Sequence, residues 1–289
     1  MYANVSFSAG SPIYFAAFPL KLLLEPVIRA LNGRPMENFD HSRFAVIADI
    51  HSNSDALAAV LRDIANQGIE SIVNLGDHLS GPMAARETAD LLLSTDMPSI
   101  CGNHDRWLIE HKPEEMISID RVAYDQLEDH HLNWLRDLPS TIWLSEEIFA
   151  CHGTPSSDTT YWMEKVSPMG EVVLRSLGEI AKEAAGINAS LLLCGHTHLP
   201  RRIDLPDGRV ILNPGSVGCP GYIDDTPVHH VVQSGTRAAC YAVVEKVKDG
   251  WATTFRHIPY DPTRMIEMAK DNDHPNWEAR LATGWVDGR

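Results

Sequence analysis

The 289-residue sequence has no apolar run long enough to cross a membrane. A spanning helix needs roughly 20 predominantly apolar residues, and the nearest candidate, Ile13 to Leu24, is interrupted by Pro19 and Lys21. The same segment lacks the basic start and the small-residue cleavage site of a secretory signal. We therefore expect no membrane partner, and we interpret residues 1–42 as a poorly ordered N-terminal extension.

Cysteine pairs are also missing. The five cysteines are Cys101, Cys151, Cys194, Cys219 and Cys240. They include no Cys-x-x-Cys motif, and an odd number does not suit a disulfide framework. Reduced thiols are typical of the cytosol. The sequence therefore predicts a cytoplasmic protein.

Positive charge is scarce, because 39 Asp and Glu residues outnumber 24 Lys and Arg residues and give a formal net charge of -15. Such a surface repels polyanions unless bound metal ions supply positive charge locally. No basic patch interleaved with aromatic residues is present, as single-strand binding would need. We expect a small-molecule substrate and no nucleic-acid polymer as partner, while the oligomeric state is left open.

Apolar runs alternate with helical segments in the first half of the chain. The run at 44–50 has an acidic residue, Asp49, next to its end and precedes a helix that Ser54 can cap. Further strands are predicted at 71–75 and 99–101, separated by a helix near 84–93. This alternation indicates an α/β protein whose ligands gather at the carboxyl ends of the strands.

The second half begins with a helical insertion over about 105–140 and then returns to strands. The later predicted elements are strands at 142–144, 148–151 and 191–194, a helix over 171–185, and hairpins over 201–212 and 241–258. Two sheets packed face to face with outer helices fit this order. We predict one catalytic domain over 43–260, followed by a C-terminal tail over 261–289.

Five short motifs stand in order, each at or just past the end of an apolar run. They are Asp49-Ile50-His51, Gly76-Asp77-His78, Gly102-Asn103-His104-Asp105, Cys151-His152-Gly153 and Gly195-His196-Thr197-His198. Chain segments that end at the same sheet edge bring their last residues together. Carboxylate, imidazole and amide oxygen are ligands of transition metals, whereas calcium sites are almost all oxygen. A single such residue is more often a cap or a surface group, but five in order favour a metal site.

The five motifs resemble the pattern of the calcineurin-like metallophosphoesterase superfamily, D-x-H, G-D, G-N-H-D/E, H and G-H-x-H. The segment 213–218, Asn-Pro-Gly-Ser-Val-Gly, resembles the small bacterial phosphodiesterase-type branch. The resemblance implies a four-layer α/β/β/α sandwich with two mixed sheets and a binuclear metal site at the strand carboxyl ends. It also implies an enzyme, a metal-dependent hydrolase of ester bonds that cleaves phosphoesters by attack of a hydroxide bridging two metals.

The resemblance further implies a role for each motif residue. One metal would be held by Asp49, His51, Asp77 and His198, and the second by Asp77, Asn103, His152 and His196. Asp77 would be the bridge, since a carboxylate can bind a cation with each oxygen. The ions would be divalent Mn, Fe, Zn, Co or Ni, with Mn favoured. His104 would protonate the leaving oxygen and Asp105 would orient His104.

Missing arginines separate this chain from two branches that it resembles. Protein serine/threonine phosphatases and dinucleoside-tetraphosphate hydrolases carry arginines in G-D-x-x-D-R-G and R-G-N-H-E, but 76–82 here reads Gly-Asp-His-Leu-Ser-Gly-Pro and Cys101 precedes Gly102. We therefore predict a phosphomonoesterase or phosphodiesterase acting on small molecules or nucleotides. A phosphoprotein phosphatase or dinucleoside-polyphosphate hydrolase of the same fold is the first alternative. A non-catalytic scaffold is the second.

Residues outside the motifs are assigned simpler roles. Five histidines, His111, His130, His131, His229 and His230, are interpreted as structural or surface groups. We expect the insertion and the loop 154–168, which includes Tyr161 and Trp162, to shape substrate specificity.

Overall fold

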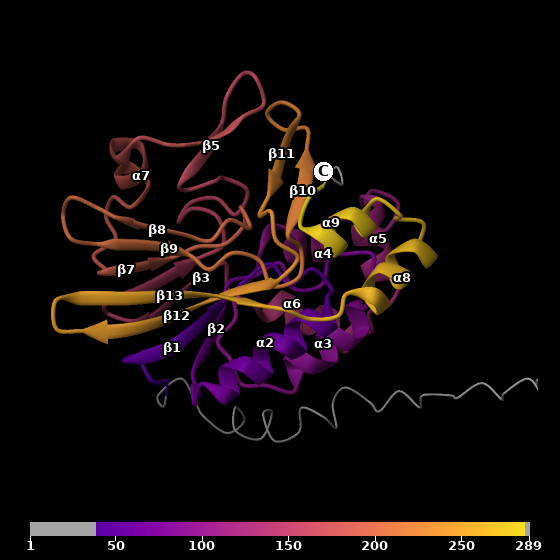
Figure 1. Cartoon of the computed structure of the whole chain (residues 1–289), viewed down its shortest axis with the longest axis horizontal. Helices are drawn as coiled ribbons and strands as arrows, with labels where there is room; N and C mark the ends of the chain where they lie inside the picture. The colour runs from indigo at the N-terminus through magenta and orange to yellow at the C-terminus, as the bar shows by residue number, and fades with distance from the viewer. Residues whose placement is uncertain (1–38, 287–289) are drawn as a thin grey trace, which may run out of the picture.

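The computed structural model describes residues 39–286. The predicted N-terminal extension, 1–42, therefore lies almost wholly outside the described residues. Figure 1 shows two central sheets, with helices on the outer face of each. No described helix is long and apolar enough to cross a membrane.

The first sheet has four strands in the order β13-β12-β1-β2. Its strands are β1 (Arg43–Ile47), β2 (Ile72–Asn74), β12 (Ala239–Val247) and β13 (Gly250–Ile258). β1 runs parallel to β2 and antiparallel to β12, so the sheet is mixed. A parallel bridge from Asn74 to Ser99 extends it where the sequence predicts a third strand.

The second sheet has five strands in the order β3-β4-β7-β9-β8. Its strands are β3 (Thr141–Ser145), β4 (Ile148–Cys151), β7 (Leu191–Leu193), β8 (Arg201–Asp204) and β9 (Val210–Asn213). The three central strands are parallel and both edge strands are antiparallel. Both predicted hairpins are present, β8–β9 and β12–β13.

Alternating side chains place one core between the sheets and one beneath each helical layer. In β1, Phe44 and Val46 face the second sheet and share a buried cluster with Leu191 of β7. Ala45 and Ile47 point the opposite way, toward the outer helices. This alternation is the period of two that a strand imposes, and it lets one strand serve two cores. The predicted four-layer sandwich with two mixed sheets is confirmed.

Three helices complete the outer layers. They are α2 (Ser54–Asn66), α3 (Ala85–Leu93) and α7 (Leu177–Glu183). α2 buries Leu57 and Leu61 in the same cluster as Tyr241 of β12. Its first turn is capped by Asn53, whose Oδ1 accepts a hydrogen bond of 3.1 Å from the backbone of Ala56. α7 covers the other sheet.

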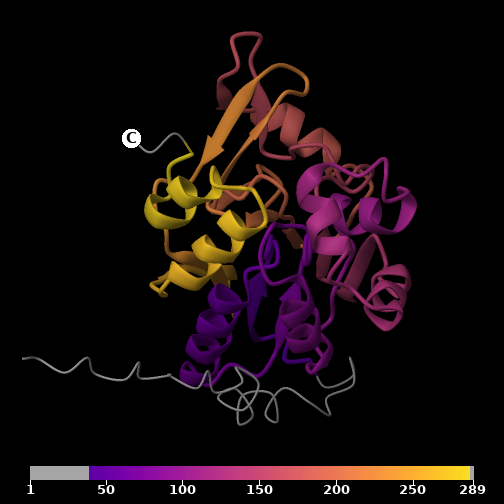
Figure 2. The same cartoon turned by 90° about the vertical axis from the view of Figure 1, so that its right-hand side faces the viewer.

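Two further groups of helices flank the strand carboxyl ends. The insertion contains α4 (Asn103–Glu110), α5 (Ser118–Tyr124) and α6 (Asp129–Asp137), and the chain ends with α8 (Thr263–Asp271) and α9 (Trp277–Thr283). Figure 2 shows the insertion in magenta and the C-terminal helices in yellow on opposite sides of this end. A hydrogen bond of 2.9 Å joins His274 Nε2 to Ser118 Oγ at the start of α5. The segment predicted as a tail thus carries two packed helices.

The predicted helix over 171–185 is wrong in its first third. Residues 172–174 form β6 (Val172–Leu174), which pairs with β5 (Glu164–Val166). Two adjacent valines favour a strand, and Ser176 then caps α7 by accepting a hydrogen bond from the backbone of Glu179. A second hairpin, β10 (Gly221–Asp224) with β11 (His230–Gln233), was not predicted.

Candidate functional site

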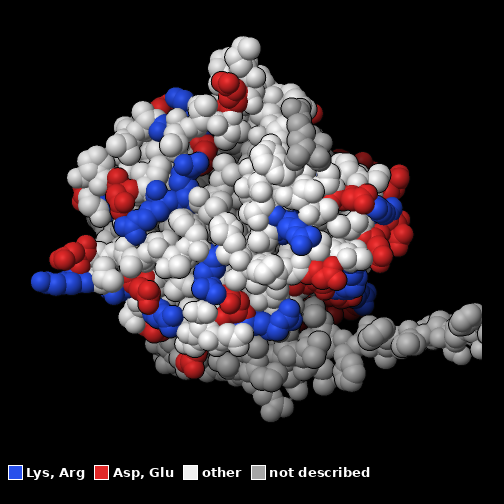
Figure 3. Space-filling model, viewed as in Figure 1, with Lys and Arg blue, Asp and Glu red and all other residues white. Residues whose placement is uncertain are grey.

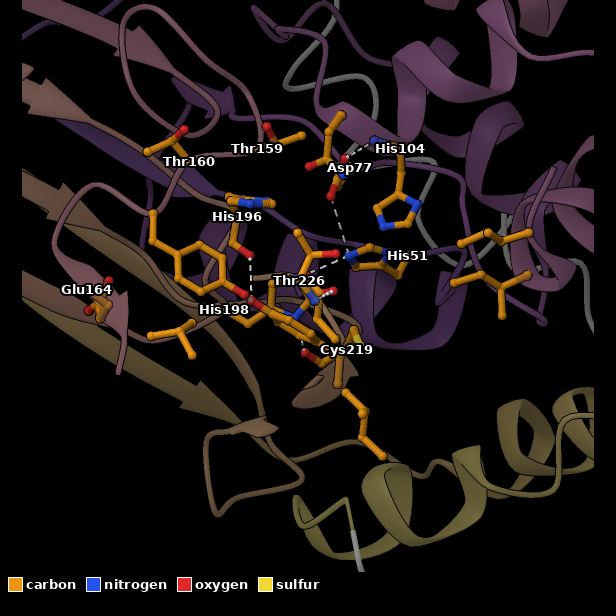
Figure 4. A pocket seen from close by; sticks show the side chains of 18 of the residues that line it. His51, Asp77, His104, Thr159, Thr160, Glu164, His196, His198, Cys219 and Thr226 are labelled. Atoms are coloured by element: carbon orange, nitrogen blue, oxygen red, sulfur yellow. Dashed lines mark hydrogen bonds and ion pairs between the residues drawn. The ribbon is translucent and has the colours of Figure 1, made fainter. Parts of the chain in front are cut away.

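All five motifs lie at one edge of the two sheets. The loops after β1, β2, β4 and β7 and the first turn of α4 bring them together. Figure 4 shows that the side chains of His51, Asp77, His104, His196 and His198 approach one another there. Side chains that are far apart in the sequence are in contact, as with His51 and His198, which are separated by 147 residues.

The carboxylates and imidazoles form two groups of three potential metal ligands. The groups are Asp49, His51 and His198, and Asp77, His152 and His196, with the ligand atoms of each within 4.8 Å of one another. Asp77 lies between the groups, because its Oδ2 is 3.3 Å from His152 Nε2 and 3.7 Å from His51 Nε2. Asn103 joins the second group, with its Oδ1 3.1 Å from His152 Nε2.

Backbone carbonyls fix the orientation of three of the imidazoles. The Nδ1 atoms of His51, His152 and His198 lie 2.9, 2.7 and 2.7 Å from the carbonyl oxygens of Ser80, Leu75 and Cys219, respectively. A carbonyl only accepts, so each Nδ1 carries a proton and, in the neutral ring, each Nε2 is a free acceptor. Metal-binding histidines are held in this way.

Atoms that should repel one another face each other across the site. His51 Nε2 and His198 Nε2, both acceptors in that tautomer, are 3.1 Å apart. Asp49 Oδ2 is buried and has no hydrogen-bond partner among the described residues. A cation held by the two imidazole nitrogens and the Asp49 carboxylate, whose Oδ1 lies 3.5 Å from His198 Nε2, would relieve this repulsion. The donor set of oxygen and imidazole nitrogen therefore fits divalent transition metals.

Burial shapes the titration of the two groups. It lowers the pKa of His51 to about 4 and that of His196 to about 3, so both rings are neutral at pH 7, the form in which histidine binds metals. Burial also raises the pKa of Asp49 to about 8. Burial alone lowers the pKa of His152, but the charges of Asp77 and Asp49 outweigh it and raise that pKa to about 10. The carboxylates thus draw positive charge to this place.

Backbone strain is concentrated at the site. Seven described residues other than glycine have positive φ, and five of them are predicted metal ligands. These five are Asp49, His51, Asp77, His196 and His198, with φ between 47° and 69°. Each such conformation costs about 1–3 kcal/mol and is typical of functional sites. Strain at five positions in one place favours a role beyond folding.

His104 makes a contact that differs from the prediction. Its Nδ1 lies 3.0 Å from Asp120 Oδ1 in α5, and Ser80 Oγ also donates to that oxygen. Asp105 instead accepts from the backbone of Asp77, His78 and Gly102 and from the ring of His78. Asp120 therefore orients His104, and Asp105 holds the loops around Asp77.

The segment 213–218 fastens two motif loops together. Asn213 Nδ2 donates to the carbonyl of Gly195 at 2.6 Å and to Thr197 Oγ1 at 3.0 Å. Ser216 Oγ donates to the carbonyl of Asp49 at 2.7 Å. This segment thus positions the first and last motifs relative to each other.

A pocket of about 930 Å³ opens over both groups of ligands. Trp107 of α4 and Tyr161 of the loop 154–168 line it, as expected for segments that shape specificity. Trp162 does not, because it is buried beneath α7 and donates to the carbonyl of Ile180. Tyr222 of β10 adds a wall by donating to Tyr161 Oη at 2.7 Å. A substrate in this pocket could reach both groups of potential metal ligands.

A third group of potential ligands, Asp90, His130 and His131, lies in the helical region away from the pocket. His131 Nδ1 accepts from the backbone of Glu128, and its Nε2 faces Asp90 at 3.1 Å. Both ring nitrogens are thus used in holding α6. His230 likewise supports a neighbour, since its Nε2 lies 2.9 Å from Tyr161 Oη. These contacts agree with the structural roles predicted for His131 and His230.

The sequence-based prediction missed Asp120, which contacts His104. It also missed Trp277 and Arg280 of α9, which line the pocket. None of them belongs to a motif, and none follows a strand. The only sequence signal for Asp120 was its position in the insertion, which was predicted to border the site. Trp277 and Arg280 lie in the predicted C-terminal tail, for which no role was predicted.

A family model described as the calcineurin-like phosphoesterase superfamily domain matches residues 43–236. The chain belongs to this superfamily, as its motifs predicted, and the membership supports a hydrolase of phosphoesters. The chain is 26% identical over 250 residues to the uncharacterised protein MJ0912 of Methanocaldococcus jannaschii, covering 82% of this chain and 95% of that protein. It is also similar to a metallophosphoesterase structure from Sphaerobacter thermophilus, with 25% identity, a TM-score of 0.66, and coverage of 84% and 100%.

Proposed function

We propose that this protein is a metal-dependent phosphoesterase that cleaves phosphomonoesters or phosphodiesters of small molecules or nucleotides in the cytoplasm. Two divalent ions, with Mn favoured, would occupy the two groups of ligands. The observation that most supports this proposal is a set of three buried imidazoles, those of His51, His152 and His198. Their Nε2 atoms face the carboxylates beneath an open pocket. All five cysteines are free, as the cytoplasmic proposal requires.

Bound there, two divalent ions would supply a nucleophilic water at neutral pH and neutralise charge on the phosphoryl oxygens. Asp77 would be shared by both ions, and its Oδ1 accepts a hydrogen bond of 2.9 Å from the backbone of His104. That contact ties the first turn of α4 to the carboxylate.

His104 would act on the leaving group. Its Nδ1–H donates to Asp120, so in the protonated ring the Nε2–H is left for the leaving oxygen. Its side chain remains 18% exposed, and it lines the pocket. Asp120 acts through His104 and is a positioning residue.

The test is hydrolysis of p-nitrophenyl phosphate and bis-p-nitrophenyl phosphate by metal-stripped protein with and without added Mn. We expect Mn-dependent turnover, and the ratio of the two rates reports the preference for monoester or diester. Asp77→Asn and His152→Ala should lose at least about 100-fold in kcat/KM. The first removes the charge of the proposed bridging carboxylate, and the second removes a proposed ligand beside it. The control is His130→Ala, which changes an exposed residue of the third group and should match the wild type.

Metal content separates the alternatives. Two equivalents of Mn per chain would support the binuclear site, whereas a protein that binds no divalent ion would favour the non-catalytic scaffold. Full Mn-dependent turnover by the Asp77 variant would contradict the assignment of the site.

A further inference from the structure

Arg280 is a buried cation that lines the pocket and has no anionic partner among the described residues. It lies in α9 and is 5% exposed. Its Nε has no hydrogen-bond partner, and within residues 39–286 its guanidinium forms no ion pair with a carboxylate. Burying an unpaired charge costs several kcal/mol, so such a group is retained where another molecule completes it.

The other two long cationic side chains of the pocket are already paired. Lys165 Nζ lies 2.8 Å from a carboxylate oxygen of Glu179, and Arg175 Nη2 lies 3.2 Å from Glu183. Arg280 is therefore the lysine or arginine of this pocket whose charge remains uncompensated within the described chain. Because the other two cations are paired, Arg280 is the candidate in this pocket for binding an anion.

The guanidinium is held in place before any ligand arrives. Its central carbon lies 4.7 Å from the centre of the Trp277 ring, and the Cys219 thiol is beside it. Trp277 and Leu281 are themselves buried against Met83, which anchors α9 on the body of the molecule. A fixed planar fork of N–H donors suits an anion with two oxygens, and its rotamer entropy is already lost.

Cys219 also connects Arg280 to the metal groups. Its carbonyl accepts from His198 Nδ1 at 2.7 Å, while its thiol contacts the guanidinium. Arg280 is thus one residue removed from a predicted ligand. Figure 4 shows Cys219 next to His198 on the wall of the pocket.

We propose that Arg280 is an anion-binding residue of the substrate pocket and that it binds phosphate or carboxylate oxygens of the substrate. The proposal rests on the proposed function, and it adds recognition from outside the matched domain, which ends at residue 236. The arginines of the motifs G-D-x-x-D-R-G and R-G-N-H-E, which this chain resembles only in part, fall at Gly81 and Cys101 here. Arg280 would supply a guanidinium from the C-terminal helices. The bound anion is either the scissile phosphoryl group or a second anionic group of the same substrate.

Three variants test the proposal in the Mn-loaded full chain. Arg280→Met removes the charge and keeps an apolar stem, Arg280→Lys restores the charge, and Arg175→Met is the matched control from the same pocket. The readouts are KM for p-nitrophenyl phosphate and the inhibition constants of glycerol 3-phosphate and 3-phosphoglycerate. These two inhibitors differ in that one has a hydroxymethyl group where the other has a carboxylate.

Losing a hydrogen bond to a charged group should weaken binding by about 10- to 100-fold in Arg280→Met. Arg280→Lys should recover part of this loss, and Arg175→Met should stay within about twofold of the wild type. A loss for all three ligands would identify the scissile phosphoryl as the bound group. A loss confined to 3-phosphoglycerate would identify a second anionic group. Wild-type constants for all three ligands in Arg280→Met would overturn the proposal.

Metal content and thermal unfolding of each variant keep the result interpretable. If Arg280→Met does not fold, Arg280→Gln replaces it, and titration calorimetry with inorganic phosphate supplies a readout that needs no turnover. Unchanged calorimetric affinities for both inorganic phosphate and 3-phosphoglycerate in Arg280→Gln would also overturn the proposal. Failure of the proposed function is distinct, since it would appear as wild-type protein that neither binds Mn nor hydrolyses either ester.

Discussion

Replacing Asp120 with asparagine should slow catalysis without disturbing metal binding. The Asp120 side chain is 1% exposed, and its Oδ1 accepts from His104 Nδ1 at 3.0 Å. Asparagine has nearly the same shape and can keep an oxygen in this place, but it removes the charge. A hydrogen bond to a charged group contributes about 1.5–3 kcal/mol. If that is lost in the transition state, kcat falls by about 10- to 150-fold.

The dependence on the leaving group identifies the cause. A p-nitrophenolate leaves without a proton, whereas an alkoxide needs one, so the loss in kcat should be larger for an alkyl phosphate such as glycerol 3-phosphate. Steady-state kinetics on both esters, with metal content measured in parallel, make the comparison. In a His104→Ala background the Asp120 substitution should have no further effect, because the two residues act as one unit.

A matched control is available in the same helical region. Asp90 accepts from His131 Nε2 at 3.1 Å, which is a second carboxylate–imidazole contact that lies outside the pocket. Asp90→Asn should leave kcat unchanged for both esters. An equal loss for both esters in Asp120→Asn, or a further loss when it is added to His104→Ala, would refute the role of Asp120.

Two further predictions concern packing and pH. A Cβ at Gly102 would lie 2.2 Å from Asp77 Oδ1, so Gly102→Ala should displace Asp77 and reduce both bound metal and kcat/KM by more than about tenfold; Gly178→Ala, where a Cβ meets nothing within 4 Å, is its control. The pKa of Asp63 lies below 3.8, because hydrogen bonds, chiefly from Arg256, outweigh the opposing effect of burial. The pair therefore stabilises the fold above pH 3.8 and loses this effect as pH falls through the lower folded value. Urea unfolding should show Asp63→Asn to be less stable by about 1–2 kcal/mol at pH 7, with a smaller difference near pH 3.

The candidate ligands could be placed from the sequence because each follows an apolar run. Parallel strands of one sheet end at the same edge, so the order of motifs was enough to place Asp49 and Asp77, which follow β1 and β2, close together. His152 follows β4 of the second sheet and reaches Asp77 because the two sheets pack face to face. Strand ends were less accurate, and β1 stops at Ile47, three residues before the apolar run does. The backbone must leave the sheet early there, because Asp49 adopts a positive φ that a strand cannot hold.

The orientation of His104 could not be predicted, because it depends on tertiary packing. Asp105 is adjacent in sequence, but as the third residue of α4 it turns back to cap the helix and binds the backbone of Gly102. Asp120 reaches His104 only because α5 packs against α4. No spacing rule relates a residue in one short helix to a residue in another.

Charge on the surface and charge in the pocket follow different rules. Figure 3 shows Lys and Arg side chains in several small groups with acidic side chains beside them. Surface pairs of this kind contribute little to stability or recognition, because solvent screens them. Arg280 is buried beside Trp277, where an electrostatic interaction is much stronger. A chain with a formal charge of -15 can therefore still select an anionic substrate within its pocket.

The candidate metal ligands and the pocket residues around them come from different parts of the chain. Loops at the strand ends supply the candidate ligands, whereas α5 supplies Asp120 and α9 supplies Arg280. The hydrogen bond between Ser118 Oγ and His274 Nε2 links the start of α5 to the segment before α9, so the two additions border the pocket together. Changes in these helices would therefore alter leaving-group protonation and anion recognition without removing a metal ligand. On these proposals, substrate choice would depend on the helical additions, and metal binding would depend on the loops at the strand ends.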